Sequence, residues 1–135
     1  MTVKLSRLIA VLAVLWSGSA MADDPKPVAL CEIVQHPSAY QGLIVRTRGR
    51  YNSDCLERSV FVSAECRLGI ELDAPDRIAG HAFDEVCVGP PGMPWRNTVR
   101  MTVTGKFEWK PQARPAFILH ATSITDVTIK RPRHL

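Results

Sequence analysis

The sequence predicts a mainly β domain: a closed barrel of five strands, with a short helix before the first strand and a helical connection between the third and the fourth. Three observations predict this fold class. Five segments read as strands, and two of them, residues 45–51 and 98–109, alternate with the period of two that one-sided strands show. A helical pattern separates the third of these segments from the fourth, and two of the segments carry a glycine at matching places. The alternative is a different small β-barrel or a β-sandwich.

The start of the chain has the features of a secretory signal. Lys4 and Arg7 precede an apolar run of nine residues from Leu8 to Trp16. Ala20-Met21-Ala22 then matches the small-x-small rule for signal cleavage. A run of nine apolar residues is too short to span a bilayer, which takes about twenty. We therefore expect cleavage after Ala22 and a periplasmic or secreted mature protein.

That expectation divides the chain into three parts. Residues 1–22 form the signal peptide, residues 23–129 a single domain and residues 130–135 a basic flexible tail. The formal net charge of the chain is +4. Because residues 1–22 contain two basic residues and no acidic one, the mature part has 15 basic and 13 acidic residues and a net charge of +2. So small a charge does not predict nucleic-acid or membrane binding, and only the placement of the cations is informative.

The four cysteines lie in the mature part, at Cys31, Cys55, Cys66 and Cys87. An even number of cysteines behind an export signal favours two disulfides, because the compartment is oxidising. The cysteines form no C-x-x-C pair, and the four histidines are scattered along the chain. We therefore expect no metal site and no cofactor.

The first half of the domain is predicted to hold one helix and three strands. Residues 28–35 have the apolar pattern of a short helix packed on one side, and Pro37 ends it, because a residue before proline is displaced from helical geometry. Residues 43–51 alternate strictly and form the first strand. Residues 59–63 and 68–72 form the second and third strands.

A helix and an irregular loop follow the third strand. Asp73 is expected to cap this helix, with Pro75 in its first turn and Val86 near its end. Residues 89–94 contain three prolines and two glycines and are expected to form a loop.

Two strands complete the domain. Residues 98–109 place their large apolar side chains on one parity and form the fourth strand. Residues 116–122 begin the fifth strand, which Ile124, Val127 and Ile129 either extend or follow as a short edge.

The first and fourth strands resemble each other. Val45–Tyr51 aligns with Met101–Phe107, and each has alternating β-formers followed by a glycine, a cation and an aromatic residue. A glycine inside a strand marks a place where the backbone bends or where another chain segment comes close. Gly49 and Gly105 therefore predict two strands that curve around one closed core.

The order of the elements, with Pro37, Tyr40-Gln41-Gly42 and the two glycine-bearing strands, resembles the small exported bacterial OB-fold proteins, including the group related to the anticodon-binding type. The resemblance covers about residues 28–128. It implies an OB-like Greek-key barrel of five strands. It implies a fold more than an activity, because OB folds host unrelated functions.

This topology also implies a disulfide pairing. Cys55 and Cys66 flank the second strand, which would hold them beyond the Cα separation of about 7 Å that a disulfide tolerates. In an antiparallel meander, the end of the second strand lies near the start of the first, where the Cys31 helix enters. The end of the third strand lies near the start of the second. The topology therefore implies the pairs Cys31–Cys66 and Cys55–Cys87.

The leading functional candidate is a basic face. Arg46, Arg48 and Arg50 project from one side of the first strand. Further candidates are cations on the neighbouring strand and loop, and tryptophans that offer stacking surfaces: Lys106, Lys110, Arg114, Trp95 and Trp109. OB folds bind single-stranded nucleic acids or sugars with such a face. Because an exported protein rarely meets nucleic acid, we expect an anionic glycan, a lipid headgroup or an acidic envelope protein. The alternative is that the arginines are only the solvated side of a half-buried strand and that Trp109 belongs to the core.

The Gly89–Asn97 loop is a second candidate. A structural or inhibitory module would dock on a partner protein through Met93-Pro94-Trp95, and tryptophan and arginine, adjacent here as Trp95 and Arg96, are the commonest interface hot spots. The alternative is that Trp95 folds back and plugs the end of the barrel.

An enzyme is the least favoured class. Several acids lie near His81 in the sequence and can be drawn as a catalytic or metal cluster: Asp73, Asp76, Asp84 and Glu85. Helix capping by Asp73 and solvation of Asp84-Glu85 explain them more simply. The sequence contains no G-x-S-x-G, H-E-x-x-H or phosphate-loop motif. We therefore expect a non-catalytic binding module, with a small envelope hydrolase as the alternative.

Overall fold

The structure of the protein is a computed structural model that describes residues 24–56, 58–88 and 97–132. The predicted signal peptide, the Gly89–Asn97 loop except Asn97, and the end of the predicted tail lie outside these residues.

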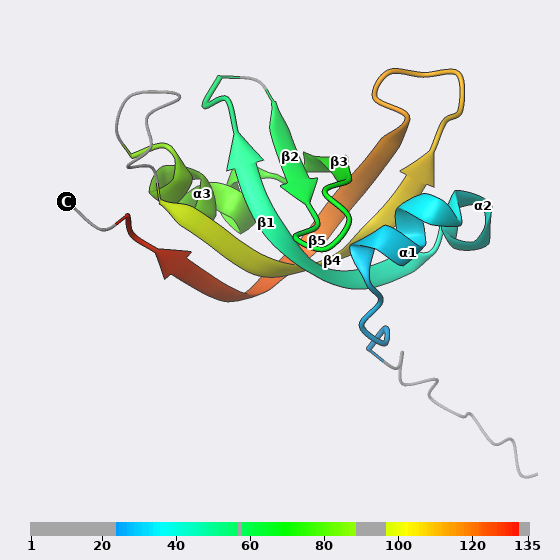
Figure 1. Ribbon diagram of the computed structural model, residues 1–135, viewed down its shortest axis with the longest axis horizontal. Helices are drawn as coiled ribbons and strands as arrows, with labels where there is room; N and C mark the ends of the chain where they lie inside the picture. The colour runs from blue at the N-terminus through cyan, green and yellow to red at the C-terminus, as the bar shows by residue number, and fades with distance from the viewer. Residues whose placement is uncertain (1–23, 57, 89–96, 133–135) are drawn as a thin grey trace, which may run out of the picture.

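Five strands close into a barrel in the order β1-β2-β3-β5-β4, with β4 paired to β1 (Figure 1). The strands are β1 (Ile44–Ser53), β2 (Ser59–Val62), β3 (Gly69–Asp73), β4 (Thr98–Trp109) and β5 (Phe117–Lys130). Neighbours are antiparallel except β3 and β5, which pair in parallel and complete the closure. The predicted fold class, an OB-like barrel, is confirmed, and the alternative of a sandwich is excluded.

The helices also occupy the predicted places in the chain. Helix α1 (Leu30–Gln35) precedes β1, and α3 (Asp76–Val86) connects β3 to β4. The two helices lie on opposite sides of the barrel in Figure 1. Pro37 ends α1 as expected, but it also begins a further one-turn helix, α2 (Pro37–Tyr40), because proline is well suited to the first helical position.

Two local predictions are corrected. Asp73 does not cap α3: the N-cap residue is Pro75, with no side-chain cap, and Asp73 is the last residue of β3, paired with His120. The pairing with β5 holds Asp73 in the sheet and keeps its carboxylate away from the first turn of α3. At the other end of the barrel, β5 is one continuous strand that reaches Lys130, one residue into the segment expected to be tail.

The core forms where the inward parity of the strands meets the two longer helices. The largest fully buried side chains from the strands are Phe61, Phe107, Ile70, Met101 and Leu119. Helix α1 adds Leu30 and Ile33, and α3 adds Ala82 and Val86. Each helix therefore covers the barrel with one apolar face.

The two glycines of the repeated pattern lie where the backbone of a neighbouring strand comes too close for a side chain. A Cβ on Gly49 would lie 2.8 Å from the carbonyl oxygen of Val62, and one on Gly105 would collide with the carbonyl oxygen of His120. Gly105 also adjoins a register shift between β4 and β5. Both strands curve because only glycine permits these backbone approaches.

The structure contains two disulfides, Cys31–Cys66 and Cys55–Cys87, which are the pairs that the topology implied. The first joins α1 to the β2–β3 connection, and the second joins the β1–β2 connection to the end of α3. Each closes more than thirty residues, at sequence separations of 35 and 32. Two disulfides fit an oxidising extracellular compartment.

Gly105→Ala is expected to lower the free energy of unfolding by about 1–3 kcal/mol, because the added methyl group forces backbone apart in a packed sheet. Gly80→Ala is the matched control, since a Cβ there meets nothing within 4 Å in the middle of α3. That variant is expected to raise stability by about 0.5–1 kcal/mol. Urea denaturation of the oxidised proteins measures both, and equal effects of the two substitutions would contradict the role of Gly105 in bending β4.

Candidate functional site

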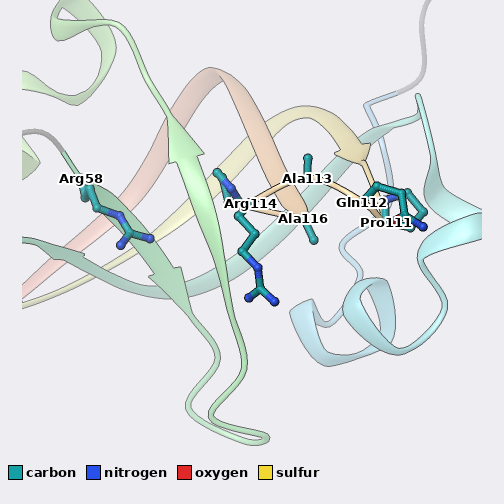
Figure 2. Close-up of a pocket in the computed structure, with 7 residues that line it drawn as sticks. Arg58, Pro111, Gln112, Ala113, Arg114 and Ala116 are labelled. Atoms are coloured by element: carbon teal, nitrogen blue, oxygen red, sulfur yellow. The ribbon is translucent and has the colours of Figure 1, made fainter.

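A surface cavity of about 720 Å³ lies between the β1–β2 connection and the β4–β5 loop, residues 110–116. Both connections rise on the same side of the barrel, with β2 and β3 between them (Figure 1). Arg58 lines the cavity from the first connection, and Pro111 to Ala116 line it from the second. Figure 2 shows Arg58 on one side and Arg114 extending from the loop. We call this cavity the trough.

The charged side chains that line the trough are both arginines. Arg114 is exposed and has no acidic partner within 4.0 Å among the described residues. Arg58 is 67% exposed, and its guanidinium lies 3.5 Å from the carboxylate of Glu71. An exposed ion pair at this separation contributes little, so the charge of Arg58 stays available to a ligand. The trough is therefore a cationic surface.

The backbone of Arg58 is held in place. Its N–H donates to the carboxylate of Asp54 at 2.9 Å, and its carbonyl accepts from the N–H of Asp54 at 3.1 Å and from the hydroxyl of Ser53 at 3.0 Å. These bonds close the β1–β2 connection into a tight turn. The position from which Arg58 reaches the trough is therefore set by the turn itself.

Trp109 adds an apolar shelf beside the trough. Its side chain is half-buried and packs against the core, and its backbone N–H donates to Oε1 of Gln41 at 2.6 Å. A shallow surface hollow of about 490 Å³ is lined by Trp109, Lys110 and the loop residues 111–113, which also line the trough. The cationic and apolar surfaces are therefore continuous.

A charged network supports the base of the β4–β5 loop. The imidazole of His120 contacts Asp73 through Nδ1 at 2.8 Å and Glu108 through Nε2 at 2.5 Å. The other carboxylate oxygen of Glu108 pairs with Lys110 at 2.8 Å. The charge of Lys110 is therefore already compensated, unlike that of Arg114.

The network shifts the titration of two of its members. The hydrogen bond from Glu108, then that from Asp73, raises the pKa of His120 above its ordinary value of 6.5. The hydrogen bond from Lys110, then that from His120, lowers the pKa of Glu108 below its ordinary value of 4.5. Both shifts favour the charged forms. The two carboxylates therefore favour the cationic form of His120.

The structure divides the predicted basic groove between two places. Arg114 lines the trough, and Trp109 and Lys110 line the adjoining hollow. Arg48 and Arg50 line a different cavity, which shares no lining residue with the trough. The remaining basic candidates, Arg46 on β1 and Lys106 on β4, line neither.

Within the described part of the chain, Arg48 is the one arginine of the β1 row whose side chain forms hydrogen bonds. Its guanidinium donates to the backbone carbonyl of Asp126 at 2.8 Å and to the hydroxyls of Thr128 and Thr102 at 3.2 and 3.4 Å. It therefore ties β1 across β4 to β5.

Arg58 and Arg100 line the two cavities but were not among the residues predicted from the sequence. Arg58 directly precedes the second strand. In an OB-like barrel the connection between the first and second strands lies across from the connection between the fourth and fifth, so the predicted fold could have indicated Arg58. Arg100 lies on the exposed parity of β4, directly opposite Arg50. Only the strand register reveals this pairing, and the sequence does not contain it.

The other candidates give no site. Trp95 and Arg96 lie outside the described residues. Asp73 pairs with His120 on the neighbouring strand, while His81 is exposed on α3, so the acids and His81 do not form the cluster that their order in the chain allowed. Among the described residues, no three His, Cys, Asp or Glu side chains are placed to hold a metal ion.

No protein-family model matches the sequence, and no curated protein matches it. The resemblance to exported OB-fold proteins therefore stays a prediction beyond the fold itself. Within the described residues, no helix combines the length and the apolar character needed to cross a bilayer.

His120→Gln is expected to destabilise the protein more at pH 6 than at pH 9. Folding raises the pKa of His120. Its contribution to the free energy of unfolding is therefore fully present below the ordinary pKa of 6.5 and is lost as the pH rises through the raised pKa. Because folding lowers the pKa of Glu108, its contribution is full above 4.5 and is lost as the pH falls through the lowered pKa. Urea denaturation of both proteins across this range measures the difference. A penalty that grows between pH 6 and pH 9 would show that His120 is neutral in the folded protein.

Proposed function

We propose that the protein is an exported, non-catalytic binding module of the cell envelope that takes an anionic glycan in the trough. The observation that carries the proposal is the pair of arginines, Arg58 and Arg114, which line the trough from two different connections with no acidic side chain among the lining residues. The two disulfides support the extracytoplasmic part of the proposal.

The chemistry of the trough favours an acidic sugar chain over other anions. Arginine recognises carboxylate and sulfate groups with two parallel hydrogen bonds. Trp109, on the continuous shelf, offers an apolar surface on which a sugar ring can stack, and Gln112 offers an amide for hydroxyl groups. The trough opens to solvent between two connections, so a sugar residue in it can remain part of a longer chain. OB folds bind oligosaccharides between the corresponding loops.

The Gly89–Asn97 loop remains the second candidate, as a docking element for a partner protein. Its tryptophan and arginine lie outside the described residues, so no observation of the structure favours it over the trough. A lipid headgroup or an acidic protein in the trough is an outcome that the binding experiment separates from a glycan.

Replacing both Arg58 and Arg114 with Gln is expected to weaken binding to immobilised heparin, a polysaccharide with carboxylate and sulfate groups, by about tenfold or more at physiological salt. The control is the double replacement of Arg77 and Arg131, which are exposed, line no described cavity and change the net charge equally. Surface plasmon resonance measures both, and the control is expected to change affinity less than twofold, roughly what screened long-range charge contributes.

Three results would contradict the proposal. Equal losses in the two double variants would mean that only net charge matters. Unchanged binding of the trough variant would place the glycan elsewhere. Tighter binding to anionic lipid vesicles or to an acidic polypeptide than to heparin, with the same dependence on Arg58 and Arg114, would assign the trough to a different anion.

A further inference from the structure

A second cavity, about 200 Å³, lies between the sheet of β1 and β4 and the β2–β3 connection. Its sheet wall carries Arg48, Arg50 and Arg100, and its loop wall carries Ser63 and Glu65. It shares no lining residue with the trough. The two cavities are therefore separate sites.

Arg50 and Arg100 form a pair of like charges. They are direct partners in the antiparallel register of β1 and β4, which places their Cβ atoms about 4.5–5.5 Å apart on one face. Both are exposed, and neither has an acidic partner within 4.0 Å among the described residues. Like charges directly opposite each other destabilise a sheet. An anion bound between Arg50 and Arg100 would reduce their electrostatic repulsion.

Arg48 adds a third positive charge to the same wall without adding a negative one. Its hydrogen-bond acceptors are a backbone carbonyl and two hydroxyls, all neutral. These bonds fix the guanidinium but leave its charge uncompensated. The sheet wall of the cavity is therefore cationic along its whole length.

Glu65 lies on the opposite wall and has no cationic partner within 4.0 Å among the described residues. The loop that carries it is rigid: the N–H of Glu65 donates to the hydroxyl of Ser63 at 3.1 Å, and the next residue, Cys66, is joined to α1 by a disulfide. The carboxylate therefore lines the cavity beside three arginines without forming an ion pair with any of them. A ligand with a positive group beside its negative one would contact both walls.

We propose that this cavity binds a small zwitterionic group, a phosphate that carries an ammonium, with the phosphate on Arg50 and Arg100 and the ammonium on Glu65. The charges correspond wall by wall: the arginines of the sheet wall face the charge of about −1.5 to −2 on a phosphate monoester, and the one carboxylate of the loop wall faces the single ammonium. Cavities for drug-sized ligands measure about 300–1,000 Å³, so a cavity of 200 Å³ fits a group of this small size. The site is independent of the function proposed for the trough.

Phosphoethanolamine is the probe, with inorganic phosphate as the matched anion, and isothermal titration calorimetry on the disulfide-bonded protein is the measurement. The protein is expected to bind phosphoethanolamine about tenfold more tightly than phosphate, because the ammonium adds a charged hydrogen bond. Arg100→Gln is expected to lose both ligands. Glu65→Gln is expected to keep phosphate and to lose the preference.

Two control variants locate the effect. Arg77→Gln removes an exposed arginine outside the cavity and is expected to leave both affinities unchanged. The double variant of Arg58 and Arg114 is expected to keep phosphoethanolamine binding while losing heparin, so the two proposals succeed or fail separately. The proposal is overturned if the protein binds neither probe, if it binds phosphate and phosphoethanolamine equally, or if Glu65→Gln keeps the preference.

A phosphate that carries an ammonium occurs in soluble monoesters and, as a diester with one negative charge, in a phospholipid headgroup. Sedimentation with phosphatidylethanolamine vesicles, against phosphatidylcholine vesicles as control, separates the two sources. Pelleting that Arg100→Gln abolishes assigns the headgroup, and calorimetric binding without pelleting assigns a soluble ester. Both results support the site, whereas pelleting that Arg100→Gln leaves intact, without calorimetric binding, overturns it.

The unliganded protein gives a test that needs no probe. Arg100→Gln removes one of two facing cations and is expected to raise the melting temperature by about 1–4 °C in low salt. The increase is expected to shrink in high salt, where exposed charges are screened. No increase in low salt would mean that the charge of Arg50 is already compensated, which overturns the proposal.

Discussion

Closure of the barrel depends on the bending of β1, because this strand pairs with β4 along most of its length and with β2 over its second half. The bend falls near Gly49, where the backbone of β2 comes so close that a Cβ would lie 2.8 Å from the carbonyl oxygen of Val62. A strand that stayed straight would leave β2 and β3 unable to reach β5. The position of both cavities follows from this bend, since the trough lies over β2 and β3 and the second cavity lies against β1 and β4.

The barrel was predicted from the strand pattern together with the order of the elements, the paired glycines and the resemblance to OB-fold proteins. The strand pattern identified the apolar face of β4 and the outward arginines of β1, and the paired glycines indicated the curvature. Asp73 was assigned wrongly because its two roles, helix cap and strand end, look alike in the sequence and only its pairing with His120 decides between them. The site was less predictable for the same reason: the opposition of Arg50 and Arg100 exists only in the register.

The number of basic residues in the sequence does not show which cationic side chains lack an acidic partner and can bind a ligand. Lys110 is paired with Glu108 at 2.8 Å, and the guanidinium of Arg48 donates its hydrogen bonds to acceptors on β4 and β5. Arg114 and Arg100, in contrast, have no acidic partner among the described residues. A net charge of only +2 over residues 23–135 is therefore compatible with two cavities that are lined by arginines, because charge is distributed unevenly over the surface.

The disulfides connect the stability of the domain to the proposed sites. Arg58 follows Cys55 by three residues, and Glu65 immediately precedes Cys66, so each cavity has one wall next to a covalent anchor. Loops in so small a domain would otherwise lose conformational freedom when a ligand binds, which weakens affinity. A loop that a disulfide already restrains has lost this conformational entropy during folding, before a ligand binds. The same two bonds that stabilise so small a domain therefore also restrain one wall of each cavity.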